Sequence, residues 1–184
     1  MFSKDILLID VEASGLDLEK HELIQLAAVL LDKKTLKEKA TFNSFIRPTK
    51  WKNRQPEAMA VNKITLDMVQ DAPVVGKVIK EFKTMFAPEQ VILANYGGVL
   101  DITFLRQAFS KAKVSFTYDY HIFNLWGLFY AYLAKHGKFT NKKKFPGFGL
   151  EDFIKQFKLP DQTHDALDDC RVEAEILRRV MKKI

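Results

Sequence analysis

Residues 6–16 read ILLIDVEASGL, and this stretch decides the fold. Four apolar residues followed by Asp10, Val11 and Glu12 predict a short buried strand over residues 6–11 that ends in acids. Side chains two apart on a strand share a face, so Asp10 and Glu12 project together where the strand meets the loop at 13–15. Like charges this close repel each other, and a divalent cation would remove that repulsion. The alternative interpretation is a solvated acidic strand end.

Three further extended segments follow this strand. Residues 22–31, ELIQLAAVLL, are apolar throughout, and residues 40–46 alternate in character before Pro48 ends them. The polar stretch 32–39 joins the two, which predicts an antiparallel pair. Residues 91–94 form a short apolar run before a loop that contains Gly97 and Gly98. These segments predict a sheet built early in the chain.

Helical spacing of apolar residues dominates the remainder. Short helices are expected between the prolines of residues 51–73, and a longer helix over 74–86, ahead of Pro88. Further helices are expected over residues 101–112, 150–157 and 165–181, with a strand and then a helix over 122–133 and a loop over 137–149. Strands come first, and strands and helices mix later. The pattern predicts an α/β fold with a mixed sheet flanked by helices.

Composition narrows the class of protein. The chain has 184 residues, of which 47% are hydrophobic and 28% charged, so we expect one globular domain over residues 1–184. The lone cysteine, Cys170, rules out an intrachain disulfide and favours a reducing compartment. No apolar run approaches the ~20 residues of a membrane span. Residues 1–10 lack the apolar core of a signal peptide. We therefore expect a cytoplasmic protein with no membrane partner.

The positive charge is partly local. The formal net charge is +6, and residues 138–144, KFTNKKK, hold four lysines and no acid. Phenylalanines interleave with the lysines over residues 138–148, which suits stacking on single-stranded bases and attraction of phosphates. Lys142 and Lys143 are therefore candidate substrate contacts. The alternative is a solvated loop whose aromatic residues pack onto the neighbouring helices.

Two later positions carry further candidate side chains. Asp101 follows the apolar run and the glycine loop, at the start of a helix, where an acid can also serve only as a cap. His164 precedes the last helix, and its partner acids could make it a metal ligand, a general base or merely a helix-start residue. Asp165 reads as a cap. The apolar stripe leaves Asp168 and Asp169 both on its borders, so helical periodicity does not choose between them.

Taken together, these groups resemble the three motifs of the DEDD exonuclease superfamily, over nearly the whole chain. The strand-end pair Asp10 and Glu12 matches the first motif, Asp101 the second, and the His-x-Ala-x-x-Asp run from His164 to Asp169 the third. Histidine in the third motif is typical of the DEDDh branch. That branch includes the proofreading epsilon subunit of DNA polymerase III, ribonuclease T and exonuclease I.

The register of the third motif selects Asp169 over Asp168. Two positions depart from the family pattern: Ala13 stands where threonine is common, and the loop from Asn95 to Asp101 is one residue longer. The resemblance implies a ribonuclease H-like fold, with a five-stranded mixed sheet flanked by helices.

The resemblance also implies an activity. It predicts a metal-dependent 3′→5′ exonuclease that hydrolyses single-stranded nucleic acid, DNA slightly favoured over RNA, and releases nucleoside 5′-monophosphates. Two Mg²⁺ ions, with Mn²⁺ as a substitute, would be held by Asp10, Glu12, Asp101 and Asp169. His164 would take the proton from the attacking water, a task that its ordinary pKa of about 6.5 suits.

The substrate contacts follow from the same comparison. Ser14, Gly15 and Leu16 would lie against the terminal nucleotide, and Asn95 would lie nearby. The expected partners are single-stranded 3′ ends, with a polymerase or a second copy of the chain as further candidates. Two alternatives stay open: an RNA-trimming or oligoribonuclease-type enzyme, and a non-catalytic nucleic-acid-binding or polymerase-accessory module. The motifs do not distinguish DNA from RNA, because that depends on contacts to the 2′-hydroxyl.

Overall fold

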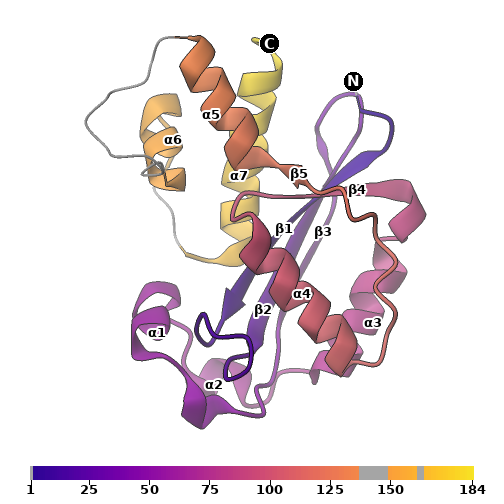
Figure 1. The fold of residues 1–184 in the computed structure, drawn as a ribbon, viewed down its shortest axis with the longest axis vertical. Helices are drawn as coiled ribbons and strands as arrows, with labels where there is room; N and C mark the ends of the chain where they lie inside the picture. Colours follow the sequence, from indigo (N-terminus) through magenta and orange to yellow (C-terminus); the bar gives the residue numbers. More distant parts are fainter. Residues whose placement is uncertain (1, 137–148, 161–163) are drawn as a thin grey trace.

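A five-stranded mixed sheet forms the centre of the computed structural model, which describes residues 2–136, 149–160 and 164–184 (Figure 1). The strand order is β3-β2-β1-β4-β5, in which β2 runs antiparallel to β1 and β3, whereas β4 runs parallel to β1 and β5. The strands are β1 (Asp5–Ala13), β2 (Leu23–Leu31), β3 (Glu38–Phe45), β4 (Val91–Asn95) and β5 (Phe123–Asn124). The predicted α/β class and the five-stranded mixed sheet are confirmed.

Helices cover both faces of this sheet (Figure 1). One face packs against α5 (Leu125–Lys135), α6 (Leu150–Phe157) and α7 (Ala166–Met181), and the other against α3 (Val75–Met85) and α4 (Val99–Lys111). Two short helices, α1 (Pro56–Asn62) and α2 (Leu66–Val69), lie past the end of β1. Single 3₁₀ turns occupy Trp51–Asn53 and Pro88–Gln90.

The alternation of β1 aims its acids at α7. Ile6 and Leu8 belong to the core shared with α5, α6 and α7, whereas Leu7 and Ile9 belong to the core shared with α3 and α4. Because every second side chain lies on the same face, Asp10 and Glu12 continue the row of Ile6 and Leu8. Packing of the apolar half of the strand therefore fixes the direction of the carboxylates.

The end of β1 is left uncovered on one side. Residues 5–8 pair with residues 91–94 of β4, whereas β2 pairs along β1 as far as Ala13. From Ile9 onward no strand of the described chain adjoins β1 on the β4 side. A bulge between Glu12 and Ala13 then twists the strand end, as bulges beside active sites often do. Ligand sites of open sheets lie beyond such strand ends.

Some predicted boundaries shift in the structure. The helix expected over residues 101–112 begins at Val99, so Asp101 lies inside its first turn. Gly98 caps this helix at a φ of 73°, in the left-handed region that glycine adopts readily. Positions 137–148 of the predicted loop, which include Lys142 and Lys143, lie outside the described residues.

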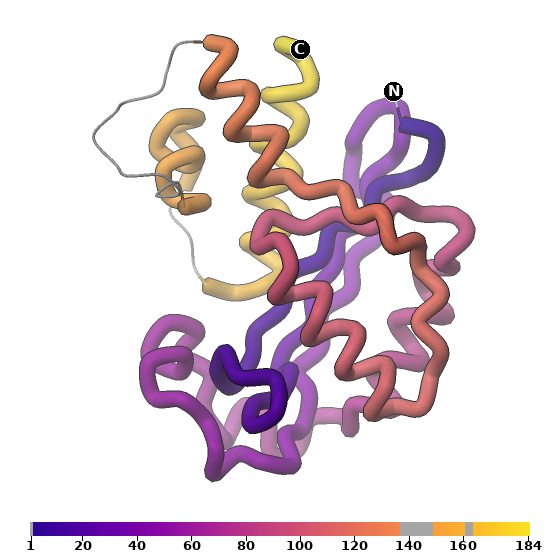
Figure 2. Tube along the Cα trace, viewed as in Figure 1, coloured from indigo at the N-terminus to yellow at the C-terminus, as the bar shows by residue number. Residues whose placement is uncertain are grey.

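The loop between β1 and β2 runs beside α1 (Figure 2). The Gln55 N–H donates to the Ser14 carbonyl at 2.7 Å, and the Leu16 N–H donates to the Gln55 side chain at 3.3 Å. Gln107 of α4 donates to the Leu18 carbonyl from the other side. These contacts fasten the loop between α1 and α4.

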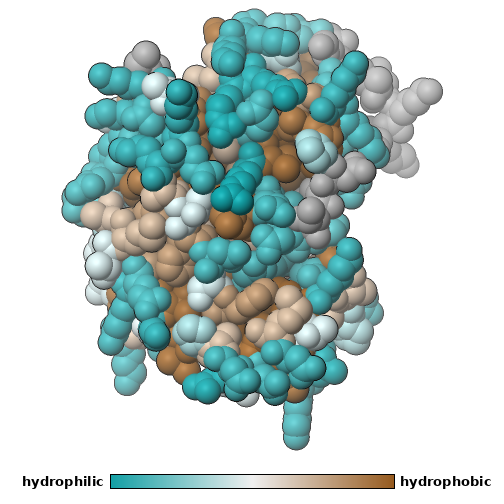
Figure 3. Space-filling model, turned by 180° about the vertical axis from the view of Figure 1, so that it is seen from behind, coloured by the Kyte–Doolittle hydropathy of each residue, from teal (hydrophilic) through white to brown (hydrophobic). Residues whose placement is uncertain are grey.

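The surface seen from behind is largely hydrophilic, with smaller hydrophobic areas between the polar side chains (Figure 3). Among the residues that the structure describes, no helix combines the length and the apolar character that crossing a bilayer requires.

Candidate active site

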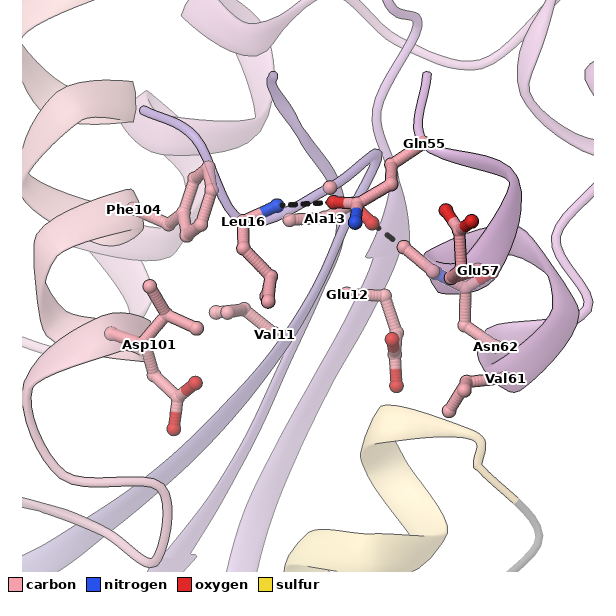
Figure 4. Close-up of a pocket in the computed structure, with 13 residues that line it drawn as sticks. Val11, Glu12, Ala13, Leu16, Gln55, Glu57, Val61, Asn62, Asp101 and Phe104 are labelled. Carbon is pink, nitrogen blue, oxygen red and sulfur yellow. Dashed lines mark hydrogen bonds between the residues drawn. The ribbon is translucent and has the colours of Figure 1, made fainter. Parts of the chain in front are cut away.

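Glu12 lies on the wall of a pocket at the end of β1 (Figure 4). The pKa of Glu12 is raised to about 7, mainly by burial and further by the charges of Asp169 and Asp101. A hydrogen bond from Asn62 lowers it in part. Asn62 also donates to the Ala13 carbonyl at 3.3 Å. Asn62 of α1 therefore contacts both the Glu12 carboxylate and the backbone that follows it.

Asp10 lies near the other acids of the site. It keeps some contact with solvent, yet protein atoms surround it, and this burial raises its pKa well above the usual range. The charges of four carboxylates raise it further, in the order Glu173, Asp101, Glu12 and Asp169. The three predicted motifs therefore come together in space around one strand residue.

Asp101 reaches the site from the first turn of α4. The Asn95 side chain donates to its carboxylate at 3.0 Å, and the Gly97 N–H donates to it as well. A Cβ on Gly97 would lie 2.5 Å from Asp101 Oδ2, so a glycine is needed there. Burial raises the pKa of Asp101 although both hydrogen bonds lower it. The longer loop between Asn95 and Asp101 thus wraps the carboxylate with donors.

The start of α7 supplies the third motif. Asp165 caps the helix by accepting from the Leu167 N–H at 3.0 Å, as the sequence predicts, and also accepts from Gln25 on β2 at 3.0 Å. His164, just ahead of the cap, is partly exposed with a φ of 58°. A non-glycine residue in that region is uncommon, and such conformations cluster at functional sites.

The two neighbouring acids of α7 have different surroundings. Asp169 is 5% exposed, and its charge raises the pKa of Asp10 and Glu12. Asp168 is exposed, and its Oδ1 atom lies 3.8 Å from Arg171 Nη1. The structure thus places Asp169 with Asp10, Glu12 and Asp101, and Asp168 on the surface.

Glu173 is a buried acid that the sequence analysis missed. It lies one turn after Asp169 on the same face of α7, and burial with the charges of Asp101 and Asp169 raises its pKa well above the usual range. The spacing of four residues from Asp169 is the signal that could have revealed it.

The pocket beside Glu12 and Asp101 has a volume of about 290 Å³. Its apolar lining comes from β1, the following loop, α1 and α4, namely Val11, Ala13, Leu16, Ala58, Val61, Leu100 and Phe104. Leu16 is 64% exposed and, in Figure 4, it lies near Phe104 across the mouth from α1. The carboxyl groups of Glu12 and Asp101 point away from this apolar end, in the direction of α7 (Figure 4).

Two of the predicted substrate contacts line the pocket, and two others are buried away from it. Leu16 and Gly15 line the pocket, and Gly15 is also required by packing, because a Cβ there would lie 2.4 Å from the His21 ring. Ser14 is buried, and its hydroxyl accepts from the Glu22 N–H at 3.0 Å. Asn95 is fully buried and holds Asp101. The side chains of Ser14 and Asn95 thus stabilise the loop and the carboxylate of the site through buried hydrogen bonds.

The donor set fits a hard divalent cation. The converging side chains are carboxylates, the ligands that Mg²⁺ and Mn²⁺ prefer. Burial raises the pKa of Asp10, Glu12 and Asp101, and neighbouring carboxylates raise those of Asp10 and Glu12 further, so a bound cation would stabilise the ionised acids. Within the described residues, no three acids, histidines or cysteines already stand at coordinating distances.

Comparisons with known proteins agree with this arrangement. The sequence model of the RNase_T exonuclease family matches residues 7–177. A PolC-type DNA polymerase III of Caldanaerobacter subterraneus subsp. tengcongensis is 27% identical over 184 residues, which is 98% of this chain and 12% of that protein. Its counterpart in Oceanobacillus iheyensis is 31% identical over 60% of this chain and 7% of its own length. The chain thus spans a small fraction of these polymerases.

Solved structures share the fold. Exonuclease I of E. coli superposes with a TM-score of 0.83 in a complex with a dA16 oligonucleotide, at 19% identity over 98% of this chain and 41% of that one. Cell-death related nuclease 4 superposes with a TM-score of 0.79 at 18% identity, over 97% of this chain and 64% of that one. With the family match over residues 7–177, the chain belongs to the RNase_T exonuclease family of the DEDD superfamily.

Proposed function

We propose that this protein removes nucleotides from the 3′ end of single-stranded nucleic acid, DNA by preference, and releases nucleoside 5′-monophosphates. The observation that carries the proposal is the convergence of Asp10, Glu12, Asp101 and Asp169 beside an apolar pocket. Two divalent cations held by these acids, Mg²⁺ in the first place, would stabilise negative charge on the phosphoryl oxygens and activate a water.

The protein's own residues would divide the remaining work. The apolar pocket, with Leu16 and Phe104, would receive the sugar and base of the terminal nucleotide and leave its phosphate beside the carboxylates. The pocket volume lies near the lower bound of small-ligand sites, about 300–1,000 Å³. This size favours one terminal nucleotide at a time, as an exonuclease requires.

His164 is the proposed general base. It precedes the helix that carries Asp169, with a left-handed backbone directly before the Asp165 cap. Its imidazole nitrogen would accept the proton of the attacking water, a task that histidine often performs in catalysis. Because His164 is partly exposed, the proton can pass on to solvent after each turnover.

The proposed substrate and partners are inferred from similarity to known proteins. Exonuclease I is described in complex with a single-stranded oligonucleotide, and the curated relatives are DNA polymerases. Both favour single-stranded DNA for this chain, and the relatives favour an association with a polymerase. Lys142 and Lys143 would attract the phosphates upstream of the terminal nucleotide.

Strands labelled at one end test the proposal. We expect a single-stranded DNA with a 3′ label to lose it as a mononucleotide at once in Mg²⁺, and a strand with a 5′ label to shorten stepwise. Asp10→Asn, assayed in parallel, should remove both signals. Release of a 5′ label first, or internal cuts, would overturn the proposed direction, and faster degradation of a matched RNA would favour the RNA-trimming alternative.

A further inference from the structure

Glu173 is a buried acid whose surroundings differ from those of other acids in the protein. It is 2% exposed, and its Oε2 atom has no hydrogen-bond partner among the described residues. The charges that act on it come from Asp101 and Asp169, and no lysine, arginine or histidine of the described chain pairs with it. Burying a carboxylate without a hydrogen-bond donor or a counter-charge lowers the stability of the fold, so a functional role for Glu173 has to be considered.

Glu22 shows how this protein satisfies a buried acid when no cation is involved. Glu22 is 7% exposed, and its two oxygens accept from the Thr49 N–H at 2.8 Å, the Thr49 hydroxyl at 2.7 Å and the Lys50 N–H at 2.7 Å. Lys111 lies 3.6 Å away. These donors lower the pKa of Glu22 in spite of its burial. Glu173 has no such set of donors.

Glu175, two residues further along α7, shows the other solution. It lies at the helix surface, where Arg178 and Arg179 pair with it at 2.6 Å and 2.7 Å. Helical geometry turns Glu173 away from these arginines, onto the face that carries Asp169. The buried face of α7 therefore presents two carboxylates, one turn apart, to the end of β1.

The position of Glu173 relative to Asp10 completes the argument. The charge of Glu173, with those of Asp101, Glu12 and Asp169, raises the pKa of Asp10, and Glu173 lies one turn from Asp169 on the buried face of α7. Its unpartnered oxygen thus belongs to the same group of acids as the motif residues. Negative charge in excess of the four motif acids would strengthen attraction for divalent cations, as supporting groups behind metal ligands commonly do.

We propose that Glu173, one turn after Asp169 on the buried face of α7, is a fifth acid of the cation site, and that its charge sets the affinity of the site for divalent cations. The inference rests on the proposed cation-dependent function. It adds a residue that the three motifs do not contain.

Metal binding measured apart from catalysis tests this inference. The full chain is treated with chelator, dialysed and titrated with Mn²⁺ in a calorimeter, and its melting temperature is recorded with and without the ion. Glu173→Gln keeps the shape of the side chain and removes its charge, and Glu173→Leu replaces it with an apolar residue suited to the neighbouring core. Asp168→Asn removes an exposed acid from the same helix and serves as the matched control.

We expect both Glu173 variants to bind Mn²⁺ about 10- to 100-fold more weakly than the wild type, and Asp168→Asn to bind it equally well. In chelator, both variants should melt at or above the wild-type temperature, because a buried acid facing other acids has been removed. Equal Mn²⁺ affinity in wild type and variants would overturn the inference and leave the proposed function standing. Melting of both variants below the wild type in chelator would also overturn it, by giving Glu173 a purely structural role. A wild type that binds no Mn²⁺ would instead overturn the proposed function.

Discussion

Asp168 and Asp169 are adjacent acids with opposite surroundings, and they allow a paired test at the scale of single residues. Asp169 is buried among the site acids, whereas Asp168 is exposed near Arg171. We expect Asp169→Asn to lose nearly all nuclease activity, and Asp168→Asn to keep most of it, because only the first removes a ligand of the proposed cations. Initial rates of nucleotide release measure both. An active Asp169→Asn with an inactive Asp168→Asn would show that the third motif is shifted by one residue.

His164 gives a second prediction at this scale. Replacing it with alanine removes the proposed proton acceptor without removing a cation ligand, so kcat should fall by a factor of about 10²–10⁴. Mn²⁺ affinity, measured by titration, should stay at the wild-type value. A variant that turns over at the wild-type rate would contradict the general-base role, and one that loses the cation would make His164 a ligand.

The residues themselves were predictable to different degrees. Asp10 and Glu12 could be found because two-residue spacing at the end of an apolar strand fixes their common face. Asn62 and Asn95, which hold Glu12 and Asp101, carry no such signal, because their contacts depend on how a loop and a helix fold back onto β1. Glu173 lies at helical spacing from Asp169, but its burial depends on the packing of α7 against the sheet.

At the scale of elements, the loop before α4 can be tested by one added methyl group. A Cβ on Gly97 would lie 2.5 Å from Asp101 Oδ2, so Gly97→Ala must displace that carboxylate or the loop. We expect weaker cation binding and slower nucleotide release, with the protein still folded. The measurements are a Mn²⁺ titration and the rate at saturating Mg²⁺.

Gly76 in α3 supplies the matched control. No heavy atom lies within 4 Å of a Cβ built at Gly76, and no residue of α3 lines the pocket beside Glu12 and Asp101. Gly76→Ala should therefore raise the free energy of unfolding by up to about 1 kcal/mol, because alanine favours helix over glycine, and should leave activity unchanged. Urea unfolding and the same nuclease assay check this. Equal loss of activity in both glycine variants would mean that the loop geometry at Gly97 has no special role.

The elements were largely visible in the sequence. Continuous apolar runs predicted β1 and β2. Pro48 and Pro88 correctly marked the chain beyond the ends of β3 and α3, which end at Phe45 and Met85. The start of α4 was placed two residues late, because Gly98 caps the helix through its backbone conformation rather than through a polar side chain. The number of strands came from family resemblance, and the order of strands was not predicted, since short runs such as β4 do not reveal their neighbours.

At the scale of the whole molecule, the gathered acids predict how stability depends on pH. Burial and repulsion raise the pKa of Glu12 to about 7 from an ordinary 4.5 and raise that of Asp10, and burial raises that of Asp101. Between these values the folded protein binds more protons than the unfolded chain, so the free energy of unfolding falls as pH rises. In chelator, the protein should melt at a lower temperature near pH 7.5 than near pH 5.5.

A divalent cation should abolish this trend, because it replaces the protons among the carboxylates. Melting curves at the two pH values, with EDTA and with Mg²⁺, measure the effect. Stability in EDTA that rises steadily over this range would mean that the acids do not share a buried site.

The central claim is that the acids around Asp10 hold the cations on which hydrolysis depends. Its most direct test is the rate of mononucleotide release from a 3′-labelled single-stranded DNA, measured against Mg²⁺ concentration after chelator treatment. We predict no release without added cation, a rate that rises steeply with Mg²⁺ to a plateau, and no release at any concentration for Asp10→Asn. Release that persists in chelator, or an Asp10→Asn variant that reaches the wild-type plateau, would contradict the account.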